Sequence, residues 1–275
     1  ELPPNNQGLI ALEALNIAEK LDAGSYAYDS AERVHYFAEA LKRAFHDGHR
    51  FITDPEFEDV PALGSKSYAA ERAATVGEHA SSVSVGGPGA PSEDGDTVLL
   101  TVADEAGNVV SLINSIFGHF GSGVVVPGTG ITLQNRGSSF SLDPDHPNRL
   151  EPGKRPFHTL IPGLAEFGVG DWAAFGVMGG YMQPQGHLQV LANLLDYDMP
   201  LQAALDAPRW RYRADGSLAV EDRFPEGLLP KLVRRGHDVV IQPPSAFGGG
   251  QITRLADGVI SGATEPRKDG IAAGF

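Results

Sequence analysis

Apolar side chains recur at helical spacing in the first fifty residues of the chain. Residues 8–22 have the spacing of an amphipathic helix, and residues 29–48 have it more strongly. Asp29 and Ser30 are start signals for the second helix, and Gly48 is a stop signal. The apolar face of this helix consists of Val34, Phe37, Ala38, Leu41 and Phe45. The pattern therefore predicts two helices before residue 50.

Alternating apolar and polar residues take over in the middle of the chain. Residues 97–103 and 108–115 alternate around the polar turn DEAGN, and residues 251–262 repeat the pattern around Asp257-Gly258, so we expect two hairpins. Further strands are expected at 124–134 (a bent pair with glycine corners), 172–178, 217–222 and 238–242, and further helices at 185–197, 200–206 and 226–235. This order of elements favours an α+β fold in which helices cover the outer faces of antiparallel sheets.

Composition narrows the class of protein. The chain has 275 residues, 41% hydrophobic and 20% charged, which suits one large domain or two small ones. A net charge of −14 argues against nucleic acid or a membrane surface as partner. The chain has no cysteine, and its nine histidines lack HxxxH and HExxH spacing, so we expect neither a metal nor another cofactor. The start, ELPPNNQG, is typical of a loop inside a longer protein, so localisation stays open.

Thr97 stands where a loose segment meets a strand. Residues 79–96 are rich in Ser, Gly and Pro, and β-patterned hydrophobics follow directly. A cut between Asp96 and Thr97 would make the Thr97 hydroxyl a nucleophile and its freed α-amine, with a pKa of roughly 8, the base. The alternative is a β-branched residue that merely opens a strand.

Three other places carry candidate chemistry. Gly179-Gly180 follow a buried strand and precede a helix, so their N–H groups suit an oxyanion hole; a plain tight turn is the alternative. A polar cluster follows the apolar run that ends at residue 134: Asn135, Arg136, Ser138 and Ser139. The planar guanidinium of Arg136 can bind a carboxylate through two hydrogen bonds; the alternative is that Arg136 is a surface arginine in a loop. In residues 151–162, Lys154 and Arg155 are candidates to hold an anion, and His158 and Thr159 to face a pocket, unless the histidine is structural.

Together these motifs resemble the γ-glutamyltransferase family of N-terminal-nucleophile hydrolases. The stretches that carry the resemblance are LPPNNQG, DTVLLTVADEAGN, FGSGVVVPGTGITLQN, PGKRPFHTLIP, the Gly-Gly turn and EPRKDGIAAGF. The resemblance implies a four-layer αββα sandwich matured by autocleavage before Thr97. It assigns the oxyanion hole to Gly179-Gly180 and places Ser115 where the family has a threonine that hydrogen-bonds the nucleophile.

The resemblance also implies a division of the chain. Residues 1–96 would be the helical C-terminal part of a large subunit with a flexible end at 79–96. Residues 97–275 would be the small catalytic subunit, and the two would form one domain. The partner of this chain would then be the upstream part of the large subunit, which in the family holds the arginine for the substrate α-carboxylate. The oligomeric state is left open.

Departures from the family pattern point to a different acyl group. Residues 136–139 (RGSS) stand where γ-glutamyl-specific members have Gln-x-Asp-Asp, Phe117 replaces a substrate-binding asparagine, and His158-Thr159 replace two serines. The aspartate that would pair with the substrate ammonium is therefore absent, and the positively charged Arg136 stands in this stretch instead. In a partly desolvated pocket this exchange favours an acyl group with a carboxylate and no ammonium. The chain is therefore most similar to the acylase and amidohydrolase branch, which includes oxamate amidohydrolases and glutaryl-type acylases.

Three hypotheses follow. The first is an amide hydrolase or acyltransferase that acts through Thr97 on small carboxylate-bearing acyl amides. The second is a true γ-glutamyltransferase or glutathione hydrolase. The third is a non-catalytic fragment or scaffold that keeps the fold.

Overall fold

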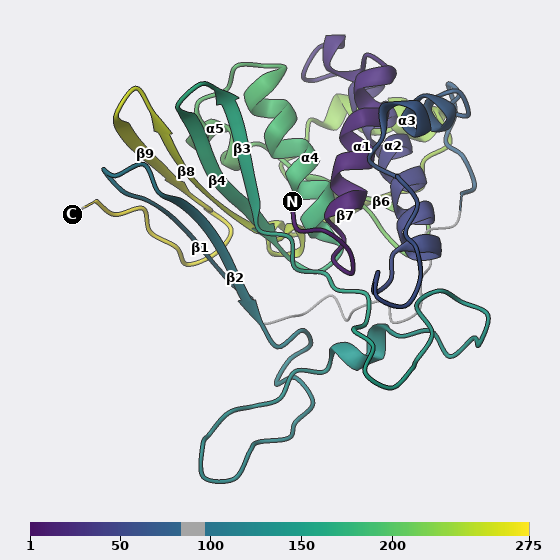
Figure 1. Cartoon of the computed structure of the whole chain (residues 1–275). Helices are drawn as coiled ribbons and strands as arrows, with labels where there is room; N and C mark the ends of the chain where they lie inside the picture. Colours follow the sequence, from purple (N-terminus) through teal and green to yellow (C-terminus); the bar gives the residue numbers. More distant parts are fainter. Residues whose placement is uncertain (84–96, 275) are drawn as a thin grey trace.

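The computed structural model describes residues 1–83 and 97–274, and it separates a helical side from a stack of strands (Figure 1). The helices are α1 (Gly8–Lys20), α2 (Ala31–Phe51), α3 (Lys66–Ala73), α4 (Met182–Leu195), α5 (Leu201–Asp206) and α6 (Leu229–Arg234). Short 3-10 turns are η1 (Ala23–Ser25), η2 (Arg136–Ser139), η3 (Glu226–Leu228) and η4 (Pro244–Phe247). The strands are β1 (Thr97–Ala103), β2 (Val109–Ser115), β3 (Gly163–Gly168), β4 (Asp171–Met178), β5 (Trp210–Tyr212), β6 (Leu218–Glu221), β7 (Val239–Gln242), β8 (Gly249–Ala256) and β9 (Val259–Thr264).

The predicted helix α2 begins as expected but does not end at Gly48. The Ser30 side chain caps it by accepting a hydrogen bond from the Arg33 N–H, and the helix continues to Phe51. A Cβ at Gly48 would collide with the side chain of Ile10 on α1. Gly48 therefore permits close packing of α1 on α2. Its prediction as a helix stop was wrong, because its role is in this contact between helices.

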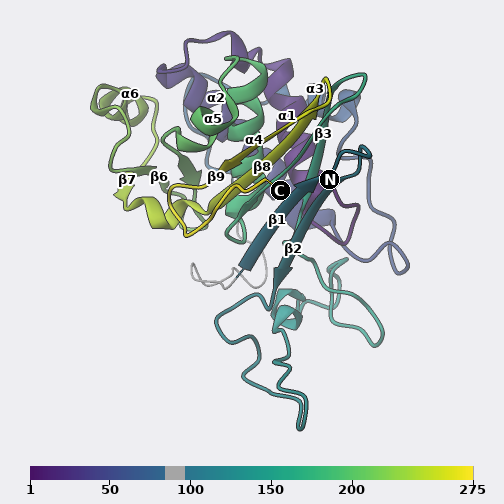
Figure 2. The same cartoon turned by 90° about the vertical axis from the view of Figure 1, so that its left-hand side faces the viewer.

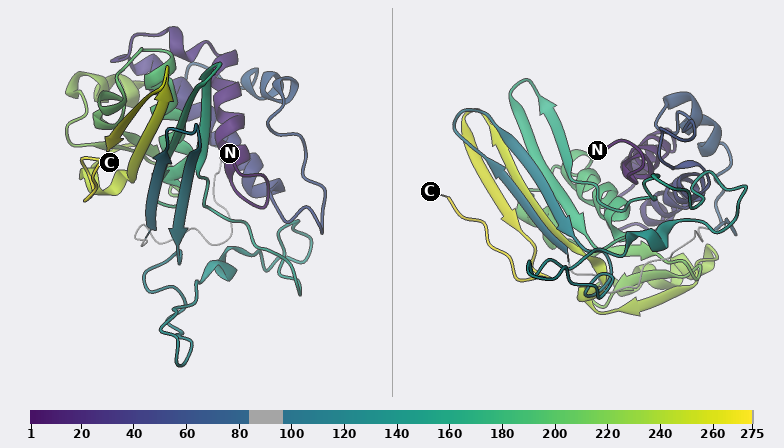
Figure 3. Two further views of the ribbon diagram at one scale, coloured as in Figure 1. Left: turned by 60° about the vertical axis from the view of Figure 1, so that its left-hand side comes forward. Right: turned by 60° about the horizontal axis from the view of Figure 1, so that its bottom comes forward.

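The β1–β2 hairpin packs face to face on a four-stranded sheet of order β3-β4-β8-β9 (Figures 2 and 3). Leu99 lies against Gly176 of β4, and Thr101 Oγ1 lies 2.8 Å from Thr253 Oγ1 of β8. On the other face of the sheet, α4 approaches closely because Gly186 lies against Val177. Hairpin, sheet and helices thus form three successive layers.

The outer face of the hairpin is apolar and exposed. Val98 and Leu100 of β1 are 65% and 55% exposed, and Leu112 of β2 is 48% exposed. In the part of the chain that the structure describes, this face carries no helical layer. The fourth layer of an αββα sandwich would lie there.

Several details differ from the expected elements. A third sheet, β5-β6-β7, contains the parallel pair β6–β7, whereas antiparallel sheets were expected. Helix α3 and strands β3 and β5 were not predicted, because short segments give weak periodicity. The bent strand pair predicted at 124–134 is present only in reduced form. Val125 and Thr132 form an antiparallel bridge, flanked by hydrogen bonds from Val126 N to Ile131 O and from Leu133 N to Val124 O, and the positive-φ residues Gly128 and Gly130 lie in the turn between the two arms.

The larger apolar core joins both sides of residue 97. It packs Phe37 and Leu41 of α2 against Leu188 of α4 and Trp210 of β5. No helix in residues 1–83 or 97–274 is long and apolar enough to cross a bilayer.

Candidate active site

Thr97 is the first residue of β1 and faces the interior of the sandwich. It pairs with Ser115 at the end of β2, and its Oγ1 donates to Ser115 Oγ at 3.0 Å. Leu99 packs on Gly176, so β1 lies over the strand β4 that leads into Gly179-Gly180. Thr97 is two residues before Leu99, and Met178 is two residues after Gly176, so this register directs Thr97 towards the end of β4 from which the predicted oxyanion turn follows. Asp96, the other side of the predicted cleavage site, lies outside the described residues.

The Gly179-Gly180 turn has the backbone geometry that only glycine adopts easily. Its φ angles are 117° and 58°. Gly179 O accepts from Met182 N at 2.8 Å, in the first turn of α4. Because the C=O and N–H of a trans peptide point in opposite directions, this bond aims the Gly180 N–H away from the helix. An N–H fixed beyond the positive end of a helix suits a developing oxyanion.

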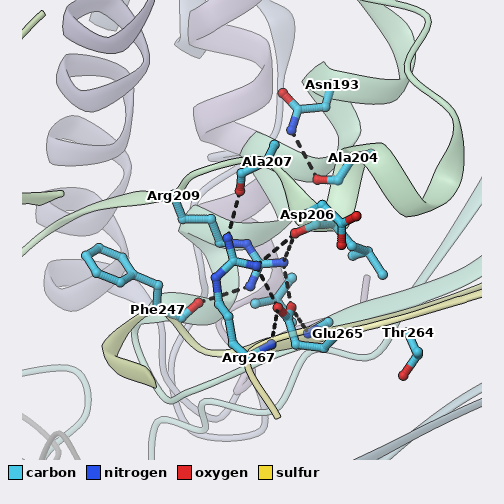
Figure 4. Close-up of polar contacts among 12 residues, drawn as sticks. Asn193, Ala204, Asp206, Ala207, Arg209, Phe247, Thr264, Glu265 and Arg267 are labelled. Carbon is cyan, nitrogen blue, oxygen red and sulfur yellow. Dashed lines mark hydrogen bonds and ion pairs between the residues drawn. The ribbon is translucent and has the colours of Figure 1, made fainter. Parts of the chain in front are cut away.

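A cluster of buried charges, Arg209, Glu265 and Arg267, holds the segment that packs against this turn (Figure 4 shows the cluster). Gly248 contacts the turn so closely that a Cβ there would collide with Met178 O. Arg209 Nη1 donates to Phe247 O at 3.1 Å, and Glu265 Oε2 accepts from Gly250 N at 2.7 Å, so residues on both sides of Gly248 are held. Arg267 completes the cluster through an ion pair with Glu265 at 2.6 Å. Burial opposes ionisation of Glu265, yet the two arginines hold its pKa below the ordinary value.

Arg136 is buried beside the other end of the Thr97–Ser115 pair. Ser115 Oγ accepts from Phe117 N at 3.0 Å, and the Arg136 guanidinium lies 5.0 Å from the centre of the Phe117 ring. Arg136 Nη1 donates to Thr159 Oγ1 at 2.9 Å, while Nη2 is buried without a hydrogen-bond partner. No carboxylate among the described residues pairs with it, and burial lowers its pKa to about 10. The cation is thus desolvated and has no anion among the residues that the structure describes.

Phe117 has a backbone conformation that is uncommon for its residue type. Its φ is 79°, in the left-handed region, and the conformation costs roughly 1–2 kcal/mol in a non-glycine residue. The neighbouring contacts with Ser115 and Arg136 hold it there. This strained residue connects the nucleophile to the guanidinium.

His158 is a neutral histidine in the same region. Its Nδ1 accepts from Leu160 N at 3.2 Å, so the ring proton is on Nε2. Burial, and next the nearby charge of Arg136, lower its pKa to about 4. At neutral pH this side chain adds no second positive charge to the pocket.

The remaining predicted residues have supporting positions. Asn135 Oδ1 accepts from Gly118 N at 3.0 Å, and so fixes the loop after β2. Ser138 is exposed and its hydroxyl donates to Asn135 O, whereas Ser139 is buried and its carbonyl accepts from the Asn148 side chain. None of these three contacts reaches Arg136.

The anion site suggested for Lys154 and Arg155 is wrong. Lys154 Nζ is paired with Glu151 at 3.0 Å, and Arg155 with Asp54 at 2.7 Å. The same contact holds the pKa of Asp54 well below its usual range. Both cations are therefore occupied by acids of the chain itself.

Sequence reasoning missed the contribution of residues 5–7. Asn6 forms a parallel bridge with His158, and Asn6 Nδ2 donates to Leu160 O at 2.6 Å. Gln7 is fully buried and contacts both Thr159 and Gly180. The stretch LPPNNQG contributed to the family resemblance, but its run of side-chain amides has no periodicity from which the role of these residues could be predicted.

One cluster among the described residues has the composition of a metal site. Ligand atoms of His35, Glu39 and His237 lie within 4.8 Å of one another. Glu39 is already paired with Lys42 and Arg43, each at 2.6 Å. Two adjacent cations oppose a divalent ion, so this donor set does not fit a metal.

Comparison with known proteins agrees with this geometry. A family model described as Gamma-glutamyltranspeptidase matches residues 1–275. The oxamate amidohydrolase proenzyme of Klebsiella pneumoniae is 40% identical over 284 residues, covering 100% of this chain and 53% of that protein. The glutathione hydrolase-like YwrD proenzyme of Bacillus subtilis is 39% identical over 289 residues, with the same coverage of 100% and 53%.

A solved structure extends the likeness to three dimensions. The crystal structure of cephalosporin acylase from Bacillus halodurans is 45% identical, has a TM-score of 0.87, and covers 100% of this chain and 50% of that chain. This match confirms the expected α+β fold of N-terminal-nucleophile hydrolases. The chain spans about half the length of these relatives. Because relatives of nearly equal identity have different named activities, similarity alone does not select a substrate.

Proposed function

Because the chain belongs to the gamma-glutamyltranspeptidase family, we propose that it is the nucleophile-bearing part of an amide hydrolase for acyl groups that carry a carboxylate. The observation that carries this proposal is the unbroken set of contacts from Thr97 through Ser115 and Phe117 to Arg136. It joins the proposed nucleophile to a buried cation that no acid of residues 1–83 or 97–274 neutralises.

Maturation would begin with an N→O acyl shift. Thr97 Oγ attacks the carbonyl carbon of Asp96, the peptide C–N bond breaks, and an ester forms with a free Thr97 amine. Water then hydrolyses the ester, which leaves the Asp96 carboxylate and regenerates the hydroxyl. We propose that residues 1–96 stay bound after the cut to residues 97–275, since the apolar core contains side chains from both parts.

The catalytic cycle would repeat this chemistry on the substrate. Thr97 Oγ attacks the amide carbonyl while the α-amine accepts the hydroxyl proton, and the Gly179-Gly180 turn stabilises the oxyanion. Collapse expels the leaving amine, which takes that proton, and water hydrolyses the acyl ester. An acceptor amine in place of water would give acyl transfer.

Arg136 is the basis for the proposed acyl specificity. Its unpartnered Nη2 and its charge suit a carboxylate, because a buried guanidinium without an anion is costly. No acid of the described residues lies there to hold an ammonium. This favours acyl groups such as glutaryl over γ-glutamyl, and makes the glutathione hydrolase the second candidate.

The upstream half would dock on the exposed face of the hairpin. The chain spans about half the length of its relatives, and Val98, Leu100, Val102, Val110 and Leu112 form an uncovered apolar surface. Surfaces of this kind in soluble proteins mark interfaces. We propose that the missing outer layer comes from that upstream part.

Three p-nitroanilides test the proposal with the complete gene product. Glutaryl carries only the carboxylate, γ-glutamyl adds the ammonium, and pentanoyl carries neither charge. We expect kcat/KM to be highest for glutaryl, and Thr97→Ala to abolish both hydrolysis and the cut before residue 97. A γ-glutamyl preference would favour the glutathione hydrolase, and an uncut, inactive wild-type protein would favour the scaffold hypothesis.

A further inference from the structure

Gln7 connects the two parts of the candidate active site. It is 0% exposed and immediately precedes α1, but its side chain does not cap that helix. Its Nε2 donates to Thr159 O at 2.6 Å and to Gly180 O at 2.9 Å. Its backbone N–H donates to His158 O at 2.9 Å. Both amide hydrogens of the side chain are thus committed to carbonyls in the part of the chain that follows Thr97.

The contact with Gly180 bears on the oxyanion turn. Gly180 O also accepts from Gln183 N at 3.2 Å, so the amide of Gln7 is a second donor on that oxygen. Two donors fix the plane of the peptide that follows Gly180. Together with the Gly179–Met182 bond, they leave the turn little freedom to rotate.

The contact with Thr159 bears on the acyl pocket. Thr159 Oγ1 is the hydrogen-bond acceptor of the Arg136 guanidinium, so the position of the Thr159 backbone sets the position of that cation. One side-chain amide therefore determines how far the oxyanion turn lies from the carboxylate-binding group. That distance must match the length of the acyl chain.

We propose that Gln7 is a positioning residue that sets the spacing between the oxyanion turn and the Arg136 pocket, and so contributes to acyl selectivity. This inference rests on the proposed function of Thr97 and Arg136. It assigns a role in the reaction to a residue on the other side of the cleavage site.

Gln7→Met removes both donors while keeping the size of the side chain. The matched control is Gln189→Met, because Gln189 is also buried and its Nε2 also donates to two carbonyls, of Gln185 at 3.0 Å and Trp210 at 2.8 Å. Both variants are made in the complete gene product, and rates are normalised to Thr97 sites counted by burst titration. This normalisation separates poor folding or processing from altered catalysis.

We expect Gln7→Met to lower kcat per site for the glutaryl anilide by about 10- to 100-fold and to reduce the glutaryl-to-pentanoyl preference. The control should lower Tm at least as much, because it also removes the Oε1 acceptor of the Trp210 N–H (3.2 Å) while Gln7 Oε1 has no partner among the described residues, and it should leave both per-site quantities unchanged. Equal per-site kinetics in Gln7→Met and wild type would overturn the positioning role and leave Gln7 a mere tether. If Thr97→Ala stays active, the proposed function itself fails, whatever Gln7→Met shows.

Gln7→Glu gives a second test, the pH dependence of kcat, which would not change if Gln7 only held the two parts of the chain together. An ionised glutamate cannot donate to the two carbonyls, whereas a protonated one can donate to one of them. Burial raises the pKa of such a carboxyl. The ratio of variant to wild-type kcat should therefore rise as the pH falls from about 7 to about 5. A ratio that is flat with pH would contradict the inference.

Discussion

Replacement of Arg136 by methionine should remove the preference for acyl groups that carry a carboxylate, without unfolding the protein. Arg136 Nη1 is occupied by Thr159, so its charge and the free Nη2 are what a substrate carboxylate would gain. A hydrogen bond to a charged group contributes about 1.5–3 kcal/mol. A loss of about 2–3 kcal/mol corresponds to about 30- to 150-fold in kcat/KM.

The assay compares glutaryl and pentanoyl p-nitroanilides, whose acyl chains differ only in the terminal carboxylate. We expect Arg136→Met to lower kcat/KM for the glutaryl substrate by that factor and to leave the pentanoyl value nearly unchanged. Tm should stay level or rise, because the variant removes a buried cation that has no acid partner in the described residues.

Two results would refute this reasoning. An equal loss for both substrates would show that Arg136 positions the site rather than binds the acyl carboxylate. A fall in Tm by several degrees in the complete protein, with unchanged selectivity, would show that an acid of the upstream half pairs with Arg136. In that case the unpaired cation would be a property of this chain alone.

Four further outcomes are expected. Gly179→Ala should lower kcat by about 100-fold or more, because φ is 117° there and the turn must change shape; full activity would exclude an oxyanion role. His158 has its pKa lowered to about 4 by burial, so the unfolded chain binds the proton first, and stability should be lost as the pH falls from about 6.5 to about 4 by at most about 3 kcal/mol. Urea unfolding of His158→Gln should lack that part of the pH dependence, and an unchanged dependence would contradict the assignment. Arg267→Met should cost about 3–5 kcal/mol in chemical denaturation because it strips a partner from buried glutamates, whereas the more exposed Arg254→Met should cost less than about 1 kcal/mol; equal losses would refute the distinction. Leu112→Ser should raise the solubility of this chain expressed alone and weaken its binding to the upstream half in pull-down titrations, and unchanged binding would place the interface elsewhere.

The strongest sequence signals were those whose physical cause is local. The helical spacing of residues 29–48 and the alternation around DEAGN each reflect one buried face, and α2 and the β1–β2 hairpin formed as predicted. Local signals failed where the cause was distant. Gly48 was interpreted as a stop although its close contact with Ile10 requires a glycine there, and the parallel pairing of β6 with β7 was not anticipated.

The sequence by itself determined the chemical parts: a hydroxyl residue after a loose segment, a glycine pair after a buried strand, and an arginine in place of acids. Only the tertiary structure decided how they relate. Packing of Leu99 on Gly176 lays β1 over the strand that leads into the glycine turn, Arg136 is buried without an acid partner among the described residues, and Gln7 joins the Gly180 carbonyl to the Thr159 backbone. Such relations depend on contacts between residues far apart in the sequence, up to 173 positions for Gln7 and Gly180, and a pattern of neighbouring residues carries no information on those distances.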